Sequence, residues 1–249
     1  MKKKNLKYLF ASLIGVSLVC LVCLMDNTEV NDVEIFKKSI HTLKSHTVNS
    51  NSFDSETVDL LNGKTIVIDP GHGGVDGGTI GLTYGTIEKE VNLTVAQNIK
   101  KQLEERTGAT VILTRDKDMD LGNTQKEALR KRIHIADKAL ADLYISIHHD
   151  AFTDTDVKGI TTHYSSNHRE SKNLAIILQN SIFNQSSNAK NRGVKESDYY
   201  VLKNNSAPAV LLELGFTSNK EDEIRMTSKD FQRKTAISIV NGIIEFFEK

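Results

Sequence analysis

Four short runs of apolar, mostly β-branched residues are spread along the chain. Runs of this kind are typical of strands that are buried on both faces, as in a parallel sheet. The predicted strands are Thr65–Asp69, Thr110–Thr114, Leu143–Ile147 and Ala209–Leu214.

Apolar residues between these runs recur every three or four positions, which predicts amphipathic helices. The apolar stripes are Ile87, Val91, Val95, Ile99 and Leu103 in a first helix and Leu129, Ile133, Ala136 and Leu140 in a second. Gly108 marks the end of the first helix, and Thr124 and Glu127 have the spacing of a capping box ahead of the second. Further helices are predicted at Ser171–Asn184 and Ser228–Phe247.

The alternation of strands and helices predicts one α/β domain, with a mostly parallel twisted sheet and helices on both of its faces. In sheets of this kind, catalytic groups usually lie in loops at the carboxyl ends of the strands. We therefore expect an active site to be built from residues that follow the predicted strands.

The amino-terminal part of the chain has a different pattern. An apolar stretch from Tyr8 to Met25 follows a cluster of lysines, as at the start of a secretory signal or a membrane anchor. As a helix, this stretch would be ~27 Å long, close to the hydrocarbon thickness of a bilayer. No small-x-small cleavage site follows Met25, so we favour a retained anchor over a cleaved signal. Since positive charge stays inside, the rest of the chain should lie outside the cytoplasm.

This pattern divides the chain into a signal or anchor segment at residues 1–25, a polar spacer at residues 26–62 and one domain at residues 63–249. Both cysteines, Cys20 and Cys23, lie in the apolar stretch. A lipid-modified cysteine is a further alternative, although valine stands where a small residue would precede either cysteine. The external domain has no thiol, so any metal ion there must be held by histidine and carboxylate side chains.

The charges of the chain balance. Lys and Arg together number 32, as do Asp and Glu, so the formal net charge is zero. Nucleic-acid binding normally relies on a basic surface. Nucleic acid is therefore not expected as a partner.

Three of the four predicted strands lead directly to a histidine or a glutamate. His72 follows the first strand, His148 the third, and Glu213 lies at the end of the fourth. Because the carboxyl ends of parallel strands meet at one edge of a sheet, these residues can lie together although they are far apart in sequence. Two imidazoles and one carboxylate form a catalytic zinc set. Glu88, in the first turn of the first helix, is well placed to supply the carboxylate.

A zinc ion lowers the pKa of bound water and polarises an amide carbonyl, which permits hydrolysis near neutral pH. Glu213 is the candidate general base that passes a proton to the leaving amine. Each residue also has a structural interpretation: His72 as a hydrogen-bonded residue, Glu88 as a charge favoured at a helix start, and Glu213 as a buried carboxylate paired with an arginine. His149 competes with His148, but neighbouring strand residues point to opposite faces, so only one should reach a metal ion.

The segment from Gly71 to Gly78 is rich in glycine, which lets the backbone turn sharply and is expected to leave room for a substrate. It lacks the Gly-Lys-Ser/Thr ending of a nucleotide-binding loop. Of the remaining histidines, His134 should face solvent or pack against the domain. His163 and His168 could line a cleft, but nothing distinguishes them from surface residues.

Six short blocks of the chain, in this order, carry a wider resemblance. The blocks are Ile66–Gly74, Glu88–Leu93, Leu113–Asp116, Ser146–His148, Asn191–Val194 and Pro208–Phe216. Together they resemble the zinc-dependent N-acetylmuramoyl-L-alanine amidase domain, often called amidase type 3. The resemblance implies one Zn²⁺ per chain held by His72, Glu88 and His148, a catalytic Glu213, and a place for Arg192 near the substrate groove. It further implies cleavage of the amide bond between N-acetylmuramic acid and L-alanine in bacterial peptidoglycan.

The chain departs from this family pattern in two places. Many relatives have asparagine two positions after the second histidine ligand, where this chain has Asp150. The stretch from His148 to Gly159 is too short for the helix that plugs the cleft of some regulated relatives, so control by a protein activator or by membrane placement is a hypothesis only.

Two other functions remain open. One is a zinc peptidase that acts within the cross-linking peptides, which its products would distinguish from an amidase. The other is an anchored wall-binding or activator protein with an inactive hydrolase fold. Retention of all four site residues argues against this second alternative.

Overall fold

All four predicted strands are present in the computed structural model, which describes residues 59–185 and 189–249. The predicted segment 1–25 and nearly all of the predicted spacer lie outside the described residues. The described end of that spacer packs against the domain, because Leu61 is 2% exposed and its amide donates a hydrogen bond to the carbonyl of Thr107. None of the described helices has the length and apolar character needed to cross a bilayer.

Six strands form one sheet in the order β2-β1-β3-β6-β4-β5. The strands are β1 (Thr65–Pro70), β2 (Thr110–Leu113), β3 (Leu143–Asp150), β4 (Ile160–Tyr164), β5 (Asn191–Glu196) and β6 (Ala209–Phe216). The first four in this order are mutually parallel, whereas β4 runs antiparallel to β6 and parallel to β5. The prediction of a mostly parallel sheet is confirmed, and two strands extend it at one edge.

The two additional strands lack the pattern by which the others were found. β4 reads ITTHY and β5 reads NRGVKE, so neither has a long apolar run. β4 is nevertheless buried along its whole length, because it lies between β6 and β5. The burial of β4 depends on elements that are distant in sequence, so the local sequence pattern could not predict this strand.

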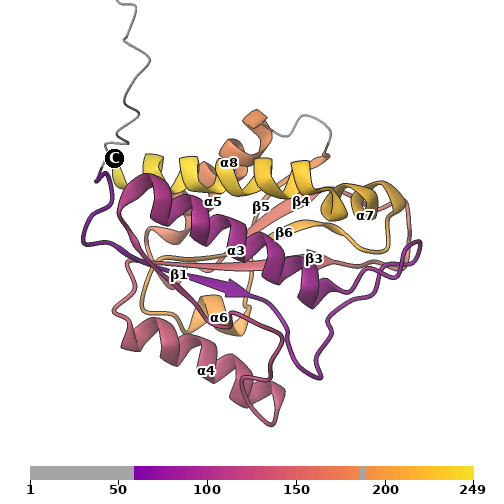
Figure 1. The fold of residues 1–249 in the computed structure, drawn as a ribbon, viewed down its shortest axis with the longest axis horizontal. Helices are drawn as coiled ribbons and strands as arrows, with labels where there is room; N and C mark the ends of the chain where they lie inside the picture. Colours follow the sequence, from indigo (N-terminus) through magenta and orange to yellow (C-terminus); the bar gives the residue numbers. More distant parts are fainter. Residues whose placement is uncertain (1–58, 186–188) are drawn as a thin grey trace, which may run out of the picture. The chain divides into compact units, whose positions relative to one another are not determined.

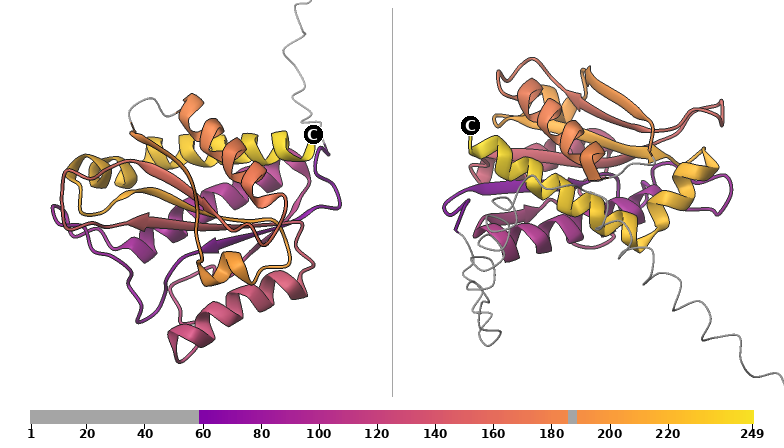
Figure 2. Two further views of the ribbon diagram at one scale, coloured as in Figure 1. Left: turned by 180° about the vertical axis from the view of Figure 1, so that it is seen from behind. Right: turned by 90° about the horizontal axis from the view of Figure 1, so that it is seen from above.

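Helices cover both faces of the sheet, as predicted (Figure 1, Figure 2). The helices are α3 (Glu88–Thr107), α4 (Gln125–Lys138), α5 (Ser171–Gln185), α6 (Tyr200–Lys203), α7 (Lys220–Thr227) and α8 (Lys229–Phe247). α3, α5 and α8 lie on one face and enclose the larger apolar core, while α4 and α6 lie on the other over a smaller one (Figure 1). The short, polar α7 carries no apolar stripe and was not predicted.

Local signals set the ends of the two helices that flank the first half of the sheet. Gly108 ends α3 in the left-handed conformation, with φ of 69°, and the Thr124 side chain accepts a hydrogen bond from the Glu127 amide ahead of α4. Both predictions are confirmed. The predicted apolar stripe of this helix was wrong at its last member. Leu140 lies two residues beyond Lys138, where α4 ends, and it is 85% exposed.

Candidate metal centre

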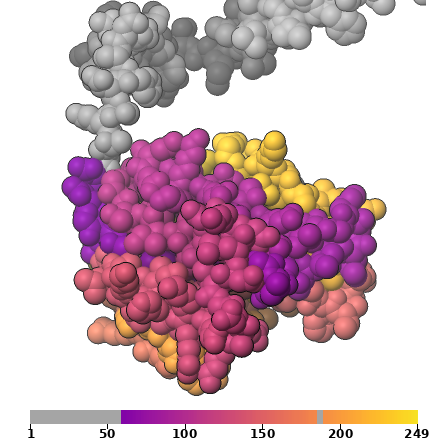
Figure 3. All heavy atoms as spheres, turned by 60° about the horizontal axis from the view of Figure 1, so that its bottom comes forward, coloured from indigo at the N-terminus to yellow at the C-terminus, as the bar shows by residue number. Residues whose placement is uncertain are grey.

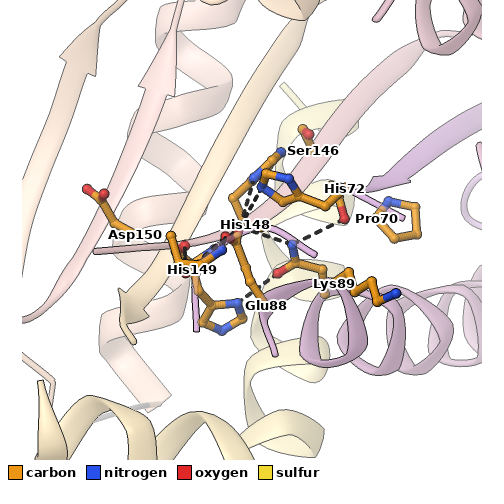
Figure 4. A network of polar contacts seen from close by, with 12 residues as sticks. Pro70, His72, Glu88, Lys89, Ser146, His148, His149 and Asp150 are labelled. Atoms are coloured by element: carbon orange, nitrogen blue, oxygen red, sulfur yellow. Dashed lines mark hydrogen bonds and ion pairs between the residues drawn. The ribbon is translucent and has the colours of Figure 1, made fainter. Parts of the chain in front are cut away.

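Three segments that are far apart in sequence meet at the carboxyl edge of the parallel strands: the turn after β1, the start of α3 and the end of β3 (Figure 4). The Nε2 atom of His72 lies 3.1 Å from Oε1 of Glu88, and the Nδ1 atom of His148 lies 3.1 Å from the same oxygen. One donor atom from each residue lies within 4.8 Å of the others. The structure therefore brings together the three side chains that were predicted as metal ligands.

This donor set fits a zinc ion. Zinc in proteins lies about 2.1 Å from nitrogen and oxygen ligands in tetrahedral geometry, which places neighbouring donor atoms ~3.4 Å apart. The two contacts of 3.1 Å with the Glu88 oxygen are close to that separation. Two imidazoles and one carboxylate would leave the fourth position for water or substrate, as in catalytic zinc sites.

Hydrogen bonds hold both oxygens of the Glu88 carboxylate. Oε2 accepts from the amide of Thr79 at 2.8 Å and from its hydroxyl at 3.0 Å, while Oε1 accepts from Nδ2 of Asn92 and from the amide of His149, each at 3.2 Å. Burial alone would raise the pKa of Glu88, but hydrogen bonds with the two imidazoles outweigh it and hold that pKa well below its usual range. The carboxylate thus stays ionised in a fixed orientation.

The His72 ring is oriented by Asp76, a residue that no sequence pattern singled out. Nδ1 of His72 lies 2.9 Å from Oδ1 of Asp76, and the amide of Gly78 donates to the same oxygen at 3.1 Å. When a metal ion is bound, a proton on Nδ1 would leave the lone pair of Nε2 for the ion, as in the carboxylate–histidine–metal arrangement. Burial would lower the pKa of His72, but contacts with Glu88 and Asp76 outweigh it and raise that pKa.

His149 lies apart from the cluster. Its Nδ1 atom is 2.8 Å from Oδ1 of Asn92, and Nδ2 of Asn92 donates to Glu88 and to the carbonyl of Gly71. Since the Asn92 oxygen must then accept, the proton of His149 is on Nδ1. The register of β3 against β6 shifts between His148 and Asp150, where β6 has one additional residue. Of the two competing histidines, the structure therefore brings His148 to the cluster and uses His149 to support it.

Glu213 lies beside His148, because the two residues are directly paired across β3 and β6. It is 7% exposed, and its Oε2 atom has no hydrogen-bond partner among the described residues, so the alternative of an arginine pair is not seen there. Burial, followed by the charges of Asp150 and Glu88, raises the pKa of Glu213 well above its usual range. An unpaired buried carboxyl with a raised pKa is typical of a group that exchanges protons.

One pocket of about 300 Å³ is lined by His72, His148 and Glu213, while the buried Glu88 lies behind the two imidazoles and is not among its lining residues. Its other lining residues include Arg132 from α4 and the half-exposed Tyr199 and Tyr200 near α6. Much of its lining comes from α4 and from the segment at α6, the elements on the face of the sheet that is turned forward in Figure 3. A substrate would approach the cluster from this face.

Two glycines of residues 71–78 have a use beyond those predicted. A Cβ atom on Gly71 would lie 2.2 Å from the His148 ring, and one on Gly78 would lie 2.5 Å from Oε2 of Glu88. These two positions leave room for the protein's own site residues, and the prediction that the glycines make room for substrate was incomplete. Gly78 also has φ of 70°, which allows the predicted sharp turn.

Arg192 lies on β5, at the edge of the sheet. Its guanidinium packs over the Phe216 ring, 5.1 Å from the ring centroid, and Nη1 donates to the carbonyl of Lys158 at 3.4 Å. It is not among the residues that line the pocket with Glu213. Its contact with substrate stays a prediction.

His163 is buried beneath the pocket wall and not at the surface. It is 8% exposed, its Nδ1 atom lies 2.7 Å from the Ser197 hydroxyl, and its ring packs edge-on against Tyr199 with centroids 5.2 Å apart. Burial, followed by the charges of Lys195 and His148, lowers the pKa of His163 to about 4. The folded protein therefore favours the neutral ring.

This burial predicts a pH effect on stability. Between pH 6.5 and 4 the unfolded chain binds a proton at His163 that the folded protein excludes, so the free energy of unfolding falls as the pH falls. From about pH 7 to about pH 5, the wild type should lose about 1 to 2 kcal/mol more than His163→Gln. Urea unfolding at both pH values measures the difference. Equal pH slopes for the two proteins would contradict the prediction.

Comparison with known proteins places this site in a family. The family model for N-acetylmuramoyl-L-alanine amidase matches residues 66–245. The germination-specific N-acetylmuramoyl-L-alanine amidase of Bacillus subtilis is 34% identical over 195 residues, which cover 75% of this chain and 81% of that protein.

Solved structures agree. The N-acetylmuramoyl-L-alanine amidase AmiC2 of Nostoc punctiforme superposes with a TM-score of 0.68 and 33% identity, covering 75% of this chain and 98% of the other. The CwlD amidase of Clostridioides difficile, solved in complex with the GerS lipoprotein, gives a TM-score of 0.70 and 33% identity, covering 74% and 98%. This chain therefore belongs to the N-acetylmuramoyl-L-alanine amidase family.

Proposed function

We propose that this chain is a zinc-dependent amidase that hydrolyses the bond between N-acetylmuramic acid and L-alanine in peptidoglycan, outside the bacterial cytoplasm. The observation that carries the proposal is the meeting of His72, Glu88 and His148 in one cluster, whose two histidines line a pocket together with Glu213. Membership of the family supports the substrate, and the donor set supports the metal.

The ligands of the proposed ion are Nε2 of His72, Nδ1 of His148 and Oε1 of Glu88, with one Zn²⁺ per chain. When bound, the ion polarises the amide carbonyl and makes a water molecule more acidic. Asp76 and Asn92 would keep His72 and Glu88 in the orientation that binding requires.

Glu213 is the proposed carrier of protons. Its carboxylate takes a proton from the attacking water while the water oxygen bonds to the amide carbonyl carbon. The carbon–nitrogen bond then breaks, and Glu213 returns the proton to the nitrogen. The products are a carboxyl group on the sugar and a free amino group on L-alanine. A raised pKa suits this role, because the protonated form must persist until the amine leaves.

We also propose that residues 1–25 hold the protein at the outer face of the membrane, with residues 26–62 as a spacer to the catalytic domain at residues 63–249. The lysine cluster and the apolar stretch after it support this arrangement. Recovery of the intact chain in the membrane fraction is the expected result, and a shortened chain in the medium would contradict it.

The reaction is tested by digesting purified cell walls with the full chain in detergent. Mass spectrometry should find intact glycan and stem peptides with a free L-alanine amino group. A chelator should abolish this release, and added Zn²⁺ should restore it. New amino groups within the cross-linking peptides would instead identify a zinc peptidase, and binding to walls without products would identify an inactive wall-binding protein.

A further inference from the structure

The block Leu113–Asp116 has no part in the proposed reaction, yet it contains one of the most buried charged side chains of the domain. Arg115 lies two residues after the end of β2 and is 2% exposed. Burying a guanidinium is costly unless its donors are hydrogen-bonded. The partners of Arg115 therefore indicate what the residue does.

Apart from the carbonyl of Lys117, which accepts from Nη1 at 3.3 Å, those partners are main-chain carbonyls of the segments that carry the proposed metal ligands. Nε donates to the carbonyl of His72 at 2.7 Å and to that of Pro70 at 3.0 Å. Nη2 donates to the carbonyl of Gly71 at 2.8 Å and to that of Lys89 at 2.8 Å. One side chain thus binds three successive carbonyls around His72 and the residue directly after Glu88.

The His72 turn needs such support. His72 has φ of 61°, a left-handed conformation that is disfavoured for residues other than glycine. Arg132 on α4 also supports this turn. It pairs with the buried Asp69 and donates to the carbonyls of Pro70 at 2.9 Å and His72 at 2.7 Å. Arg132 does not contact the start of α3 in this way, so the link between the two ligand segments belongs to Arg115.

Gly73 is a second observation that places the Arg115 guanidinium against the His72 turn. A Cβ atom at position 73 would lie 2.6 Å from the Met119 carbonyl oxygen, 2.8 Å from Cδ of Arg115 and 2.9 Å from its Nε. The chain therefore has glycine where the guanidinium approaches the ligand turn. In Figure 4, Lys89 extends away from the two imidazoles, so its main chain, and not its ammonium group, provides the contact at this end.

We infer that Arg115 is a positioning residue that joins the His72 turn to the start of α3 and so sets the separation of His72 from Glu88. The inference rests on the proposed metal site. A lysine at this position would keep the positive charge, but it lacks the planar fork that donates in several fixed directions at once.

The test compares zinc affinity in the full chain, purified in detergent, by competition with a chromogenic chelator. Arg115→Lys should weaken zinc binding by about 10- to 100-fold, the range typical of lost support for a metal ligand. Gly73→Ala should weaken it in the same direction, because the new Cβ would press on the guanidinium and on the Met119 carbonyl, and a φ of 134° at this position is strained for alanine. Arg106→Lys is the matched control, because Arg106 donates to Asn241 at 2.7 Å away from the ligand turn, and its zinc affinity should equal that of the wild type.

Thermal unfolding of the metal-free proteins separates positioning from general stability. A merely structural role would lower the melting temperature and leave the zinc affinity of the folded Arg115→Lys protein unchanged, which would overturn the inference. Failure of both Arg115→Lys and Gly73→Ala to fold without zinc would also overturn it. Absence of zinc binding by the wild type would remove the proposed function, and the inference with it.

Discussion

Glu213→Gln should lower the rate of amide hydrolysis by about 10²- to 10⁴-fold, the contribution typical of a general acid–base group. Glutamine keeps the size of the side chain but cannot take a proton from water and return it to the leaving nitrogen. The Oε2 atom of Glu213 has no hydrogen-bond partner among the described residues, so the change breaks no contact there. The release of L-alanine amino groups from purified walls, measured as kcat/KM, gives the effect.

Zinc content and a surface control complete this experiment. Glu213 is not one of the three proposed ligands, so the variant should bind zinc as the wild type does. Glu221→Gln is the matched control, because Glu221 pairs with Lys158 at the surface and its loss should leave the rate unchanged. Full activity of Glu213→Gln would contradict the proposed role of Glu213. Another acidic residue near the pocket would then have to transfer the proton, and Asp150 would be the first to test.

The central residues of the site could be predicted because they follow strands. A buried parallel strand has a strong local pattern, and its carboxyl end has a known place in the sheet. His72, His148 and Glu213 were found in this way, without knowledge of any contact between them. Glu88 was found because it begins the helix that follows the glycine-rich turn.

The residues that support this cluster could not be predicted in the same way. Asp76 reaches His72 across a turn that no periodicity describes, and Arg115 reaches it from a different strand. Contacts of this kind depend on the final positions of main-chain carbonyls. Only the contact of Arg115 had a sign in the sequence, because Gly73 leaves space beside the Arg115 side chain.

Edge elements escaped prediction for a related reason. β5 is exposed or half-buried along its length, and its residues are mostly polar, so the chain there has no apolar run. His163 on β4 was expected at the surface for want of any apolar pattern, although β4 is buried by the strands on either side of it. The periodicity of apolar residues predicts burial only where one face of a helix or strand is apolar in its own sequence.

His148→Ala should abolish zinc-dependent hydrolysis by a different route. It removes one of three proposed donors, so zinc affinity should fall by more than the roughly 10- to 100-fold cost of losing a supporting contact. Chelator competition measures the affinity. His134→Ala is the matched control, since His134 is exposed on α4 and belongs neither to the cluster nor to the pocket lining. Wild-type zinc affinity in His148→Ala would contradict the proposed ligand set.

The two variants separate metal binding from proton transfer. His148→Ala and Glu213→Gln should both be inactive, but only the first should lose zinc. Excess Zn²⁺ should therefore restore part of the activity of His148→Ala and none of that of Glu213→Gln, because added metal can offset weak binding but cannot carry a proton. The opposite pattern of rescue would require the roles of the two paired residues on β3 and β6 to be exchanged.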